Sequence, residues 1–243
     1  RNILMPNFSG VWNLKEQGVA VKGDRWQSST VLYGSSYFDG SGDHIKTPAS
    51  SDFTFGTGAF TVECWYKPSF DTSGSDAIFL FDIGSNGVKW TFKSSKIRLL
   101  LVSGSGETHL QYTTGALDQS TWFHTAAVRD GSGNVNLYHN GTSVANYSSS
   151  SVNHSTNTAT IAAYGGVGSG QAYTGYVSNF RIVKGSAVYS GSSFTVPTAP
   201  LTAISGTTLL TCFNPSGTIT DASASNHTLT ISGDTVAHTS HPF

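Results

Sequence analysis

The acidic residues of this chain lack the pairing that sugar hydrolysis needs. Its glutamates are Glu16, Glu63 and Glu107, and none has a second acid within four residues. Glycosidases place two carboxylates on either side of the bond that they cleave. Glu63 shares a strand face with Trp65, so a sugar-binding surface is one interpretation. A solvated or Lys/Arg-paired carboxylate is the favoured one. We therefore expect no enzyme activity in these residues.

Other catalytic and metal-binding patterns are also missing. No Gly-x-Ser-x-Gly elbow occurs, so the chain offers no serine hydrolase nucleophile of that type. A dinucleotide-binding or phosphate-binding loop follows a strand and opens a helix, and none of the Gly-x-Gly triplets has this position. His238 and His241 have no Cys or Glu near them to complete a zinc site. His124 lies in a strand pattern without a paired nucleophile, and we assign it a structural role.

The composition narrows the class of partner. Charged residues make up 11% of the 243 residues and the formal net charge is -1, with no basic run along the chain. Nucleic-acid binding is therefore not expected. The strongest apolar run, residues 97–102, contains Arg98 and is much shorter than the roughly 20 residues of a membrane span. We expect no membrane insertion.

The elements that must position any site are strands. Short alternating segments recur between Gly, Ser, Asp and Asn clusters, and no long helical period appears. In residues 60–68, Phe60, Val62, Cys64 and Tyr66 share one face. Residues 123–129, 134–139 and 142–147 predict a three-strand meander, in which Asn140-Gly141 forms a type I′ turn. Further strands are expected at residues 77–83, 89–91, 97–102, 108–112, 158–164, 173–183 and 207–213. The predicted fold is all-β, an antiparallel two-sheet β-sandwich.

Three further expectations concern the ends, a loop and the cysteines. Residues 1–28 lack strand alternation and are expected to be an arm that links or docks the domain. Residues 184–197 are interpreted as an ordered crossing loop packed on the sandwich. Cys64 and Cys212 lie in apolar strand patterns, where a free buried thiol is commoner than a disulfide, although the disulfide stays open.

Four phrases together resemble the laminin-G-like jelly rolls of the concanavalin A-like lectin and glucanase superfamily. They are residues 37–43, 60–68, 122–141 and 173–182. The resemblance covers residues 29–233 as one domain and leaves residues 234–243 as a C-terminal tail. Residues 173–185, 194–197 and 208–213, with the opening phrase at 10–17, are most similar to domains of tail fibres and other virion proteins of marine bacteriophages, cyanophages included.

The resemblance implies calcium as a cofactor, because many such sandwiches hold this ion at one rim through Asp and Asn side chains and backbone carbonyls. Asp39 and Asp43 match the early acidic turn of the family. Asn179 stands where relatives often carry an acid, and Asp221 matches a late Asp-x-Ser-x-Asn phrase. These four residues are the implied calcium ligands, although Asp221 is also suited to capping a turn. Calcium takes six to eight oxygen ligands.

Carbohydrate binding by such a sandwich uses exposed aromatic rings together with polar groups. Tyr164, Tyr173 and Tyr176 flank a glycine-rich segment, residues 165–170, that is expected to form a rim loop. They are the implied sugar contacts. Ordinary surface or sheet packing is the alternative for each of them.

The expected function is that of a non-enzymatic virion structural protein, located on the particle surface as a fibre, spike or capsid decoration. Its partners would be a host-surface glycan or other virion proteins, and it would act as an oligomer or in many copies. Two alternatives remain: a purely structural decoration without ligand binding, and an accessory carbohydrate-binding module of a larger protein.

Overall fold

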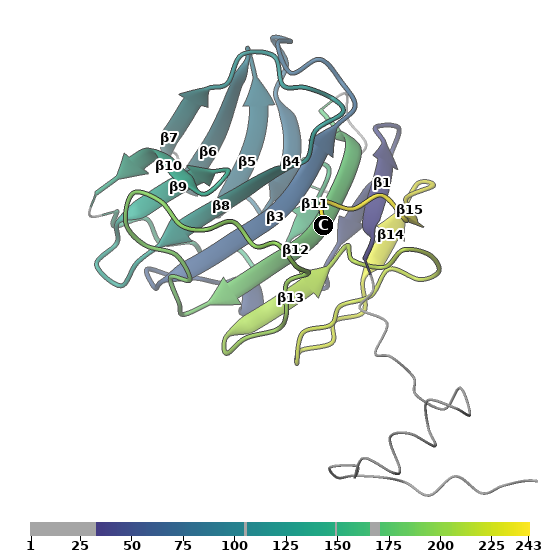
Figure 1. Cartoon of the computed structure of the whole chain (residues 1–243). Coiled ribbons are helices and arrows are strands. Elements are labelled where there is room, and N and C mark those ends of the chain that lie inside the picture. Colours follow the sequence, from purple (N-terminus) through teal and green to yellow (C-terminus); the bar gives the residue numbers. More distant parts are fainter. Residues whose placement is uncertain (1–32, 105, 149, 166–170) are drawn as a thin grey trace, which may run out of the picture. The chain divides into compact units, whose positions relative to one another are not determined.

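The computed structural model describes residues 33–104, 106–148, 150–165 and 171–243 (Figure 1). The predicted arm at residues 1–28 lies outside the described residues. In the described part the chain forms two antiparallel sheets that pack face to face, which confirms the predicted β-sandwich. No helix in these ranges is long and apolar enough to cross a membrane.

The larger sheet has the order β10-β9-β8-β3-β12-β1-β15, and β13 pairs with β12 beside this path. Its strands are β1 (Ser35–Asp39), β3 (Phe60–Pro68), β8 (Phe123–Arg129), β9 (Val135–His139), β10 (Thr142–Tyr147), β12 (Thr174–Lys184), β13 (Thr207–Thr211) and β15 (Val236–His238). Residues 236–238, which the sequence assigned to a tail, thus extend the sheet by pairing with β1. Their short Val-Ala-His run gave little strand signal on its own.

The smaller sheet has the order β14-β2-β11-β4-β5-β6-β7. Its strands are β2 (His44–Lys46), β4 (Ile78–Asp82), β5 (Val88–Lys93), β6 (Lys96–Ser103), β7 (Gly106–Thr113), β11 (Thr160–Ile161) and β14 (Thr230–Ser232). A short 3-10 helix, η1 (Ser51–Phe53), is capped by Ser50, whose Oγ accepts a hydrogen bond from the Asp52 amide.

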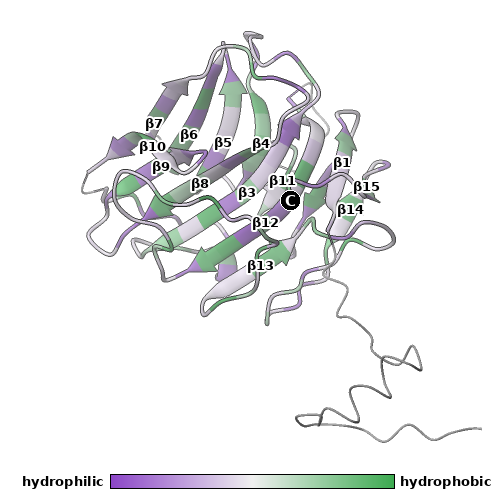
Figure 2. Ribbon diagram, viewed as in Figure 1, coloured by the Kyte–Doolittle hydropathy of each residue, from purple (hydrophilic) through white to green (hydrophobic). Residues whose placement is uncertain are grey.

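The core lies between the two sheets and follows from alternation along the strands. Phe60, Val62, Cys64 and Tyr66 of β3 are fully buried, as the sequence predicts, and face Trp90 and its neighbours on the other sheet. Figure 2 shows the same alternation as hydrophobic and hydrophilic segments along the strands. Cys64 and Cys212 are both buried and free, so the chain has no disulfide between them.

The predicted meander is confirmed. β8 pairs with β9 and β9 with β10, and the turn between the last two holds Asn140 and Gly141 at φ 48° and 77°. Positive φ at both positions is what a type I′ turn requires, and the Asn-Gly pair meets this requirement at low steric cost. A Cβ on Gly141 would lie 2.4 Å from the Phe194 carbonyl oxygen, so this position also has no room for a side chain.

A long crossing loop, residues 185–206, lies over the outer face of the larger sheet (Figure 1). Tyr189 and Phe194 stack on each other with ring centroids 3.6 Å apart. They pack against Ala126, Val128 and Tyr138 of the meander in a second small apolar cluster. The loop is therefore ordered and packed, as the sequence predicts, and it buries part of a sheet face that would otherwise be open.

Candidate functional site at one end of the sandwich

Several loops that carry acidic and aromatic residues meet at one end of the sandwich. β1 ends there at Asp39, opposite Thr174 at the start of β12, while Gly175 pairs with Pro68 at the end of β3. β7 ends and β8 begins at the same end, because β8 runs antiparallel to β3. We call this the loop end. It gathers the β1–β2, β3–β4, β7–β8 and β14–β15 connections.

Three carboxylates meet at the loop end. Asp39, Asp43 and Asp234 each offer an oxygen within 4.8 Å of the others. Asp43 is buried, with 1% of its surface exposed, whereas Asp39 and Asp234 are exposed. The β1–β2 turn brings the first two together, and the pairing of β15 with β1 and of β14 with β2 brings in the third. We call these residues the acid triad.

Backbone amides fix the orientation of Asp43. Its Oδ2 accepts a hydrogen bond from the Asp39 amide at 2.8 Å, and its Oδ1 accepts one from the Asp234 amide at 2.9 Å. Gly233 has a φ of 69°, and a Cβ there would lie 2.0 Å from Asp43 Oδ1. Glycine at this position thus lets the β14–β15 turn close on the carboxylate.

The acid triad accumulates negative charge. Burial raises the pKa of Asp43, and the neighbouring carboxylates of Asp39 and Asp234 raise it further, against the lowering effect of the two amide hydrogen bonds. Within the described ranges, no Lys, Arg or His lies within salt-bridge distance of the triad. A cation would relieve this repulsion, and an all-oxygen donor set suits a hard ion such as Ca²⁺. The residues present therefore fit calcium in chemistry and would supply three of its six to eight ligands.

The four residues predicted as calcium ligands lie in different places in the structure. Asp39 and Asp43 do come together, but Asn179 and Asp221 are not part of the triad. Asn179 is fully buried at a bulge of β12 with φ 53°, and its Oδ1 accepts from the Leu201 amide. Asp221 is buried and caps its own turn by accepting from the Leu210, Ser223 and His227 amides. Asn179 and Asp221 therefore lie apart from Asp39 and Asp43, and calcium binding stays a prediction.

An aromatic surface adjoins the acid triad on the outer face of the larger sheet. Tyr37 and Asp39 are two residues apart on β1 and so point to the same face, about 7 Å apart along the strand. Tyr37 lies beside Tyr176 on β12, with ring centroids 4.9 Å apart, and the Lys67 ammonium lies 4.4 Å from the Tyr176 centroid. Trp122 completes this surface at 6.2 Å from Tyr176.

The three tyrosines predicted from the sequence have different environments. Tyr176 is half-buried in the aromatic surface just described. Tyr164 is 40% exposed, packs against Phe79 with ring centroids 4.9 Å apart and lies under the Lys89 ammonium at 4.4 Å, so it contacts the smaller sheet and not the aromatic surface. Tyr173 is fully buried between Phe70 and Phe92, and its hydroxyl donates to the Tyr176 carbonyl oxygen. The prediction that Tyr173 contacts sugar is therefore wrong, because its ring belongs to the core.

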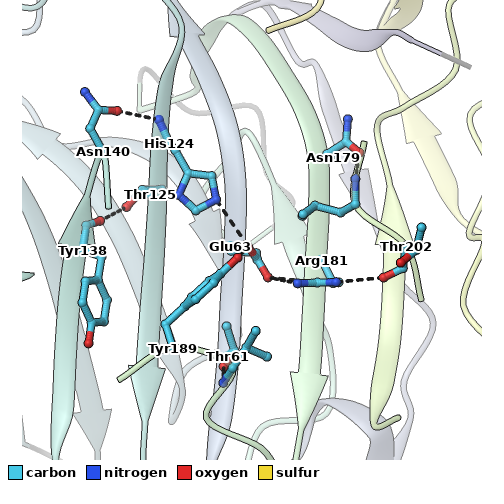
Figure 3. Close-up of polar contacts among 12 residues, drawn as sticks. Thr61, Glu63, His124, Thr125, Tyr138, Asn140, Asn179, Arg181, Tyr189 and Thr202 are labelled. Atoms are coloured by element: carbon cyan, nitrogen blue, oxygen red, sulfur yellow. Dashed lines mark hydrogen bonds and ion pairs between the residues drawn. The ribbon is translucent and has the colours of Figure 1, made fainter. Parts of the chain in front are cut away.

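Glu63 is excluded from contact with a substrate. It is fully buried under the crossing loop, where its Oε1 accepts from Arg181 Nη2 at 2.6 Å and Nε at 2.9 Å (Figure 3). Its Oε2 accepts from the Tyr189 hydroxyl at 2.7 Å and contacts His124 Nε2 at 3.3 Å. Burial alone would raise the pKa of Glu63, but His124 and Arg181 bring it below its ordinary range. The Arg-paired structural interpretation of Glu63 is confirmed.

This buried network joins the crossing loop to the sheet. Arg181 Nη1 donates to the Thr202 carbonyl oxygen at 2.8 Å, and Tyr189 reaches Glu63 from the opposite stretch of the same loop (Figure 3). We call Glu63, His124, Arg181 and Tyr189 the Glu63 network. Glu63, Arg181 and Tyr189 bond to one another and to the loop backbone and hold the loop at two points, so the role of the network is structural.

Comparisons with known proteins agree with this architecture. Residues 39–187, more than half of the chain, match the family model described as the concanavalin A-like lectin/glucanases superfamily. The chain belongs to this family. No curated protein matches it.

Solved structures align with the chain at low sequence identity. A candidate carbohydrate-binding protein from Bacteroides ovatus superposes with a TM-score of 0.61 at 16% identity, over 85% of this chain and 59% of that one. Domains LG4-5 of the mouse laminin alpha1 chain give 0.46 at 15% identity, over 69% and 48%. The binding domain of botulinum neurotoxin DC in complex with SialylT gives 0.40 at 15%, over 52% and 32%. The chain thus spans 59% or less of the length of these structures.

Proposed function

We propose that this domain is a non-enzymatic glycan-binding module that recognises sugar at the loop end and holds Ca²⁺ in the acid triad. The observation that supports it best is the acid triad beside a surface of aromatic rings. In such a site the rings pack on the apolar face of a sugar, and oxygen ligands and a cation fix its hydroxyl groups. Calcium would also relieve the repulsion among the three carboxylates.

The proposal extends to the biological setting. The phrases at residues 173–185, 194–197 and 208–213 are similar to those of marine bacteriophage virion proteins, and we place the domain on a virion surface as a fibre, spike or capsid decoration. One lectin site binds a sugar weakly, but many copies on one particle raise avidity by about 10² to 10⁴ where several sites engage at once. The partner would be a host-surface glycan, and an oligomer or many copies would be needed.

The absence of enzyme activity is part of the proposal. Glu63 is enclosed by its own network, and Glu107 is paired with His109 on the exposed strand β7. Neither forms the pair of carboxylates, facing one sugar ring, that glycosidases use. Catalysis of sugar hydrolysis by the described residues is therefore not proposed.

The test uses the 243-residue chain displayed in many copies on fluorescent beads and mixed with intact candidate host cells. We expect saturable binding with calcium and its loss with a chelator. Asp43→Asn should reduce binding, whereas Glu107→Gln, which changes an exposed carboxylate near the start of β7 and away from the loop end, should not. No binding to any cell by the multimerised chain would contradict the glycan-binding proposal and favour a purely structural decoration. Binding that ignores the chelator would contradict the calcium part alone.

A further inference from the structure

A pocket separate from the acid triad lies at the loop end, between the end of β7 and the start of β8. It is a pocket of about 330 Å³. Small-molecule sites span about 300 to 1,000 Å³, so this pocket suits one sugar ring better than a long oligosaccharide. Its lining combines aromatic rings with hydroxyl and carboxylate groups, and consists of Tyr112, Thr114, Ala116, Leu117, Asp118, Thr121, Phe123 and His139.

Three rings line the pocket and are held in place by the sheets. Phe123 stacks on His139 with ring centroids 5.5 Å apart and planes at 22°, and Tyr66 stacks behind Phe123 at 5.6 Å. Tyr112 lies 6.2 Å from His139 and is 39% exposed. A sugar ring packs its C–H groups on such rings, and a ring that already has a fixed position loses little freedom on binding.

The polar groups of the pocket are also fixed in position. Asp118 Oδ1 accepts from the Ser120 hydroxyl at 2.7 Å and from the Ser120 amide at 2.8 Å, and its Oδ2 accepts from the Thr121 hydroxyl at 2.9 Å. These hydrogen bonds lower the pKa of Asp118, so it stays ionised at neutral pH. The two oxygens of a carboxylate together have about four acceptor sites, so one site of Asp118 remains for a hydrogen bond from a ligand hydroxyl group.

The charges of the lining select against acidic sugars. Burial lowers the pKa of His139 to about 4, so its imidazole is neutral at pH 7 and offers one donor and one acceptor nitrogen. The eight lining residues include no Lys or Arg, and Asp118 carries the one charge among them at this pH. An anionic sugar would therefore meet a carboxylate without a compensating cation.

We infer that this pocket binds one neutral hexopyranose unit, with Tyr112 and Phe123 against the ring and Asp118 accepting from one of its hydroxyl groups. The inference rests on the proposed glycan-binding function and adds to it a second subsite and a selectivity. A glycan would then contact the domain at two places on the same end, and the pocket would discriminate against sialylated or uronic acid units.

The test is a nuclear magnetic resonance titration of the isotope-labelled chain with methyl glycosides of glucose, galactose and mannose. We expect shift changes at Tyr112, Phe123 and His139 for at least one of them, and none there for the methyl glycoside of N-acetylneuraminic acid. Tyr112→Ala should weaken binding about tenfold. The matched control is Tyr147→Ala, because Tyr147 is 41% exposed on β10 and does not line the pocket.

The outcomes separate the two proposals. Shift changes that cluster only at Tyr37 and Asp39 would overturn the pocket and leave the proposed function intact. Equal weakening by Tyr112→Ala and Tyr147→Ala would also overturn the pocket. A stronger response to the N-acetylneuraminic acid glycoside at Tyr112 would refute the selectivity. If none of the neutral glycosides changes the shifts, the pocket proposal is overturned. The bead assay on cells tests the proposed function separately.

Discussion

Replacement of Glu63 by alanine should destabilise the whole sandwich strongly. The change removes the partner of Arg181, whose side chain is 6% exposed, and leaves its guanidinium buried without a counter-charge. It also removes the acceptor of the Tyr189 hydroxyl. Breaking one side of a buried ion pair typically costs about 3 to 5 kcal/mol, and we expect a loss in this range.

Urea unfolding at pH 7, followed by tryptophan fluorescence, measures the free energy of unfolding. The control is Glu107→Ala, because Glu107 forms an exposed pair with His109, and such pairs contribute about 0 to 1 kcal/mol. A double variant with Glu63→Leu and Arg181→Met should recover much of the loss, since no buried charge then stays unpaired. A cost for Glu63→Ala no larger than that for Glu107→Ala would refute the structural role of the network.

Three further results are expected. The free energy of unfolding should fall as the pH drops from about 6.5 towards 5, because burial lowers the pKa of His139 and His154 to about 4 and the unfolded chain then binds more protons. The free energy of unfolding should change by up to about 1.4 kcal/mol per pH unit for each histidine, and a free energy of unfolding that stays constant in this range would contradict the lowered pKa values. Cys64 and Cys212 should resist a thiol reagent in the native state and give two reactive thiols in urea; no reactive thiol after unfolding would indicate a disulfide. Gly141→Ala should cost more than about 1 kcal/mol in thermal or urea unfolding, because its φ is 77° and a Cβ would meet the Phe194 carbonyl; an unchanged stability would contradict the turn geometry.

Local signals account for the parts of the fold that the sequence predicts well. The meander depends on Asn140-Gly141, whose turn preference acts over a few residues, and the core face of β3 follows from strict alternation. The crossing loop shows apolar residues among polar ones, which indicates packing. β14 and β15 were missed because three-residue strands carry almost no periodicity and depend on their partners.

The site required contacts that no local pattern encodes. Asp234 is 191 residues from Asp43 in sequence and reaches it through two strand pairings at the sheet edges. Tyr173 and Tyr176 differ by an odd number of residues, so alternation places them on opposite faces, and this signal could have separated them. Asn179 lies at a bulge, which breaks the alternation, and its buried side chain accepts from the Leu201 amide of the crossing loop.

Glycan binding without cleavage is the central claim, and an immobilised-glycan assay tests it most directly. Glycans released from the surface of the bound cells are coupled to a sensor, and the multimerised chain is titrated over them in calcium. The account predicts saturable retention, loss of retention for Tyr37→Ala, and no reducing ends released from the glycans. Absence of retention on every glycan, or release of reducing ends that requires the folded chain, would contradict it.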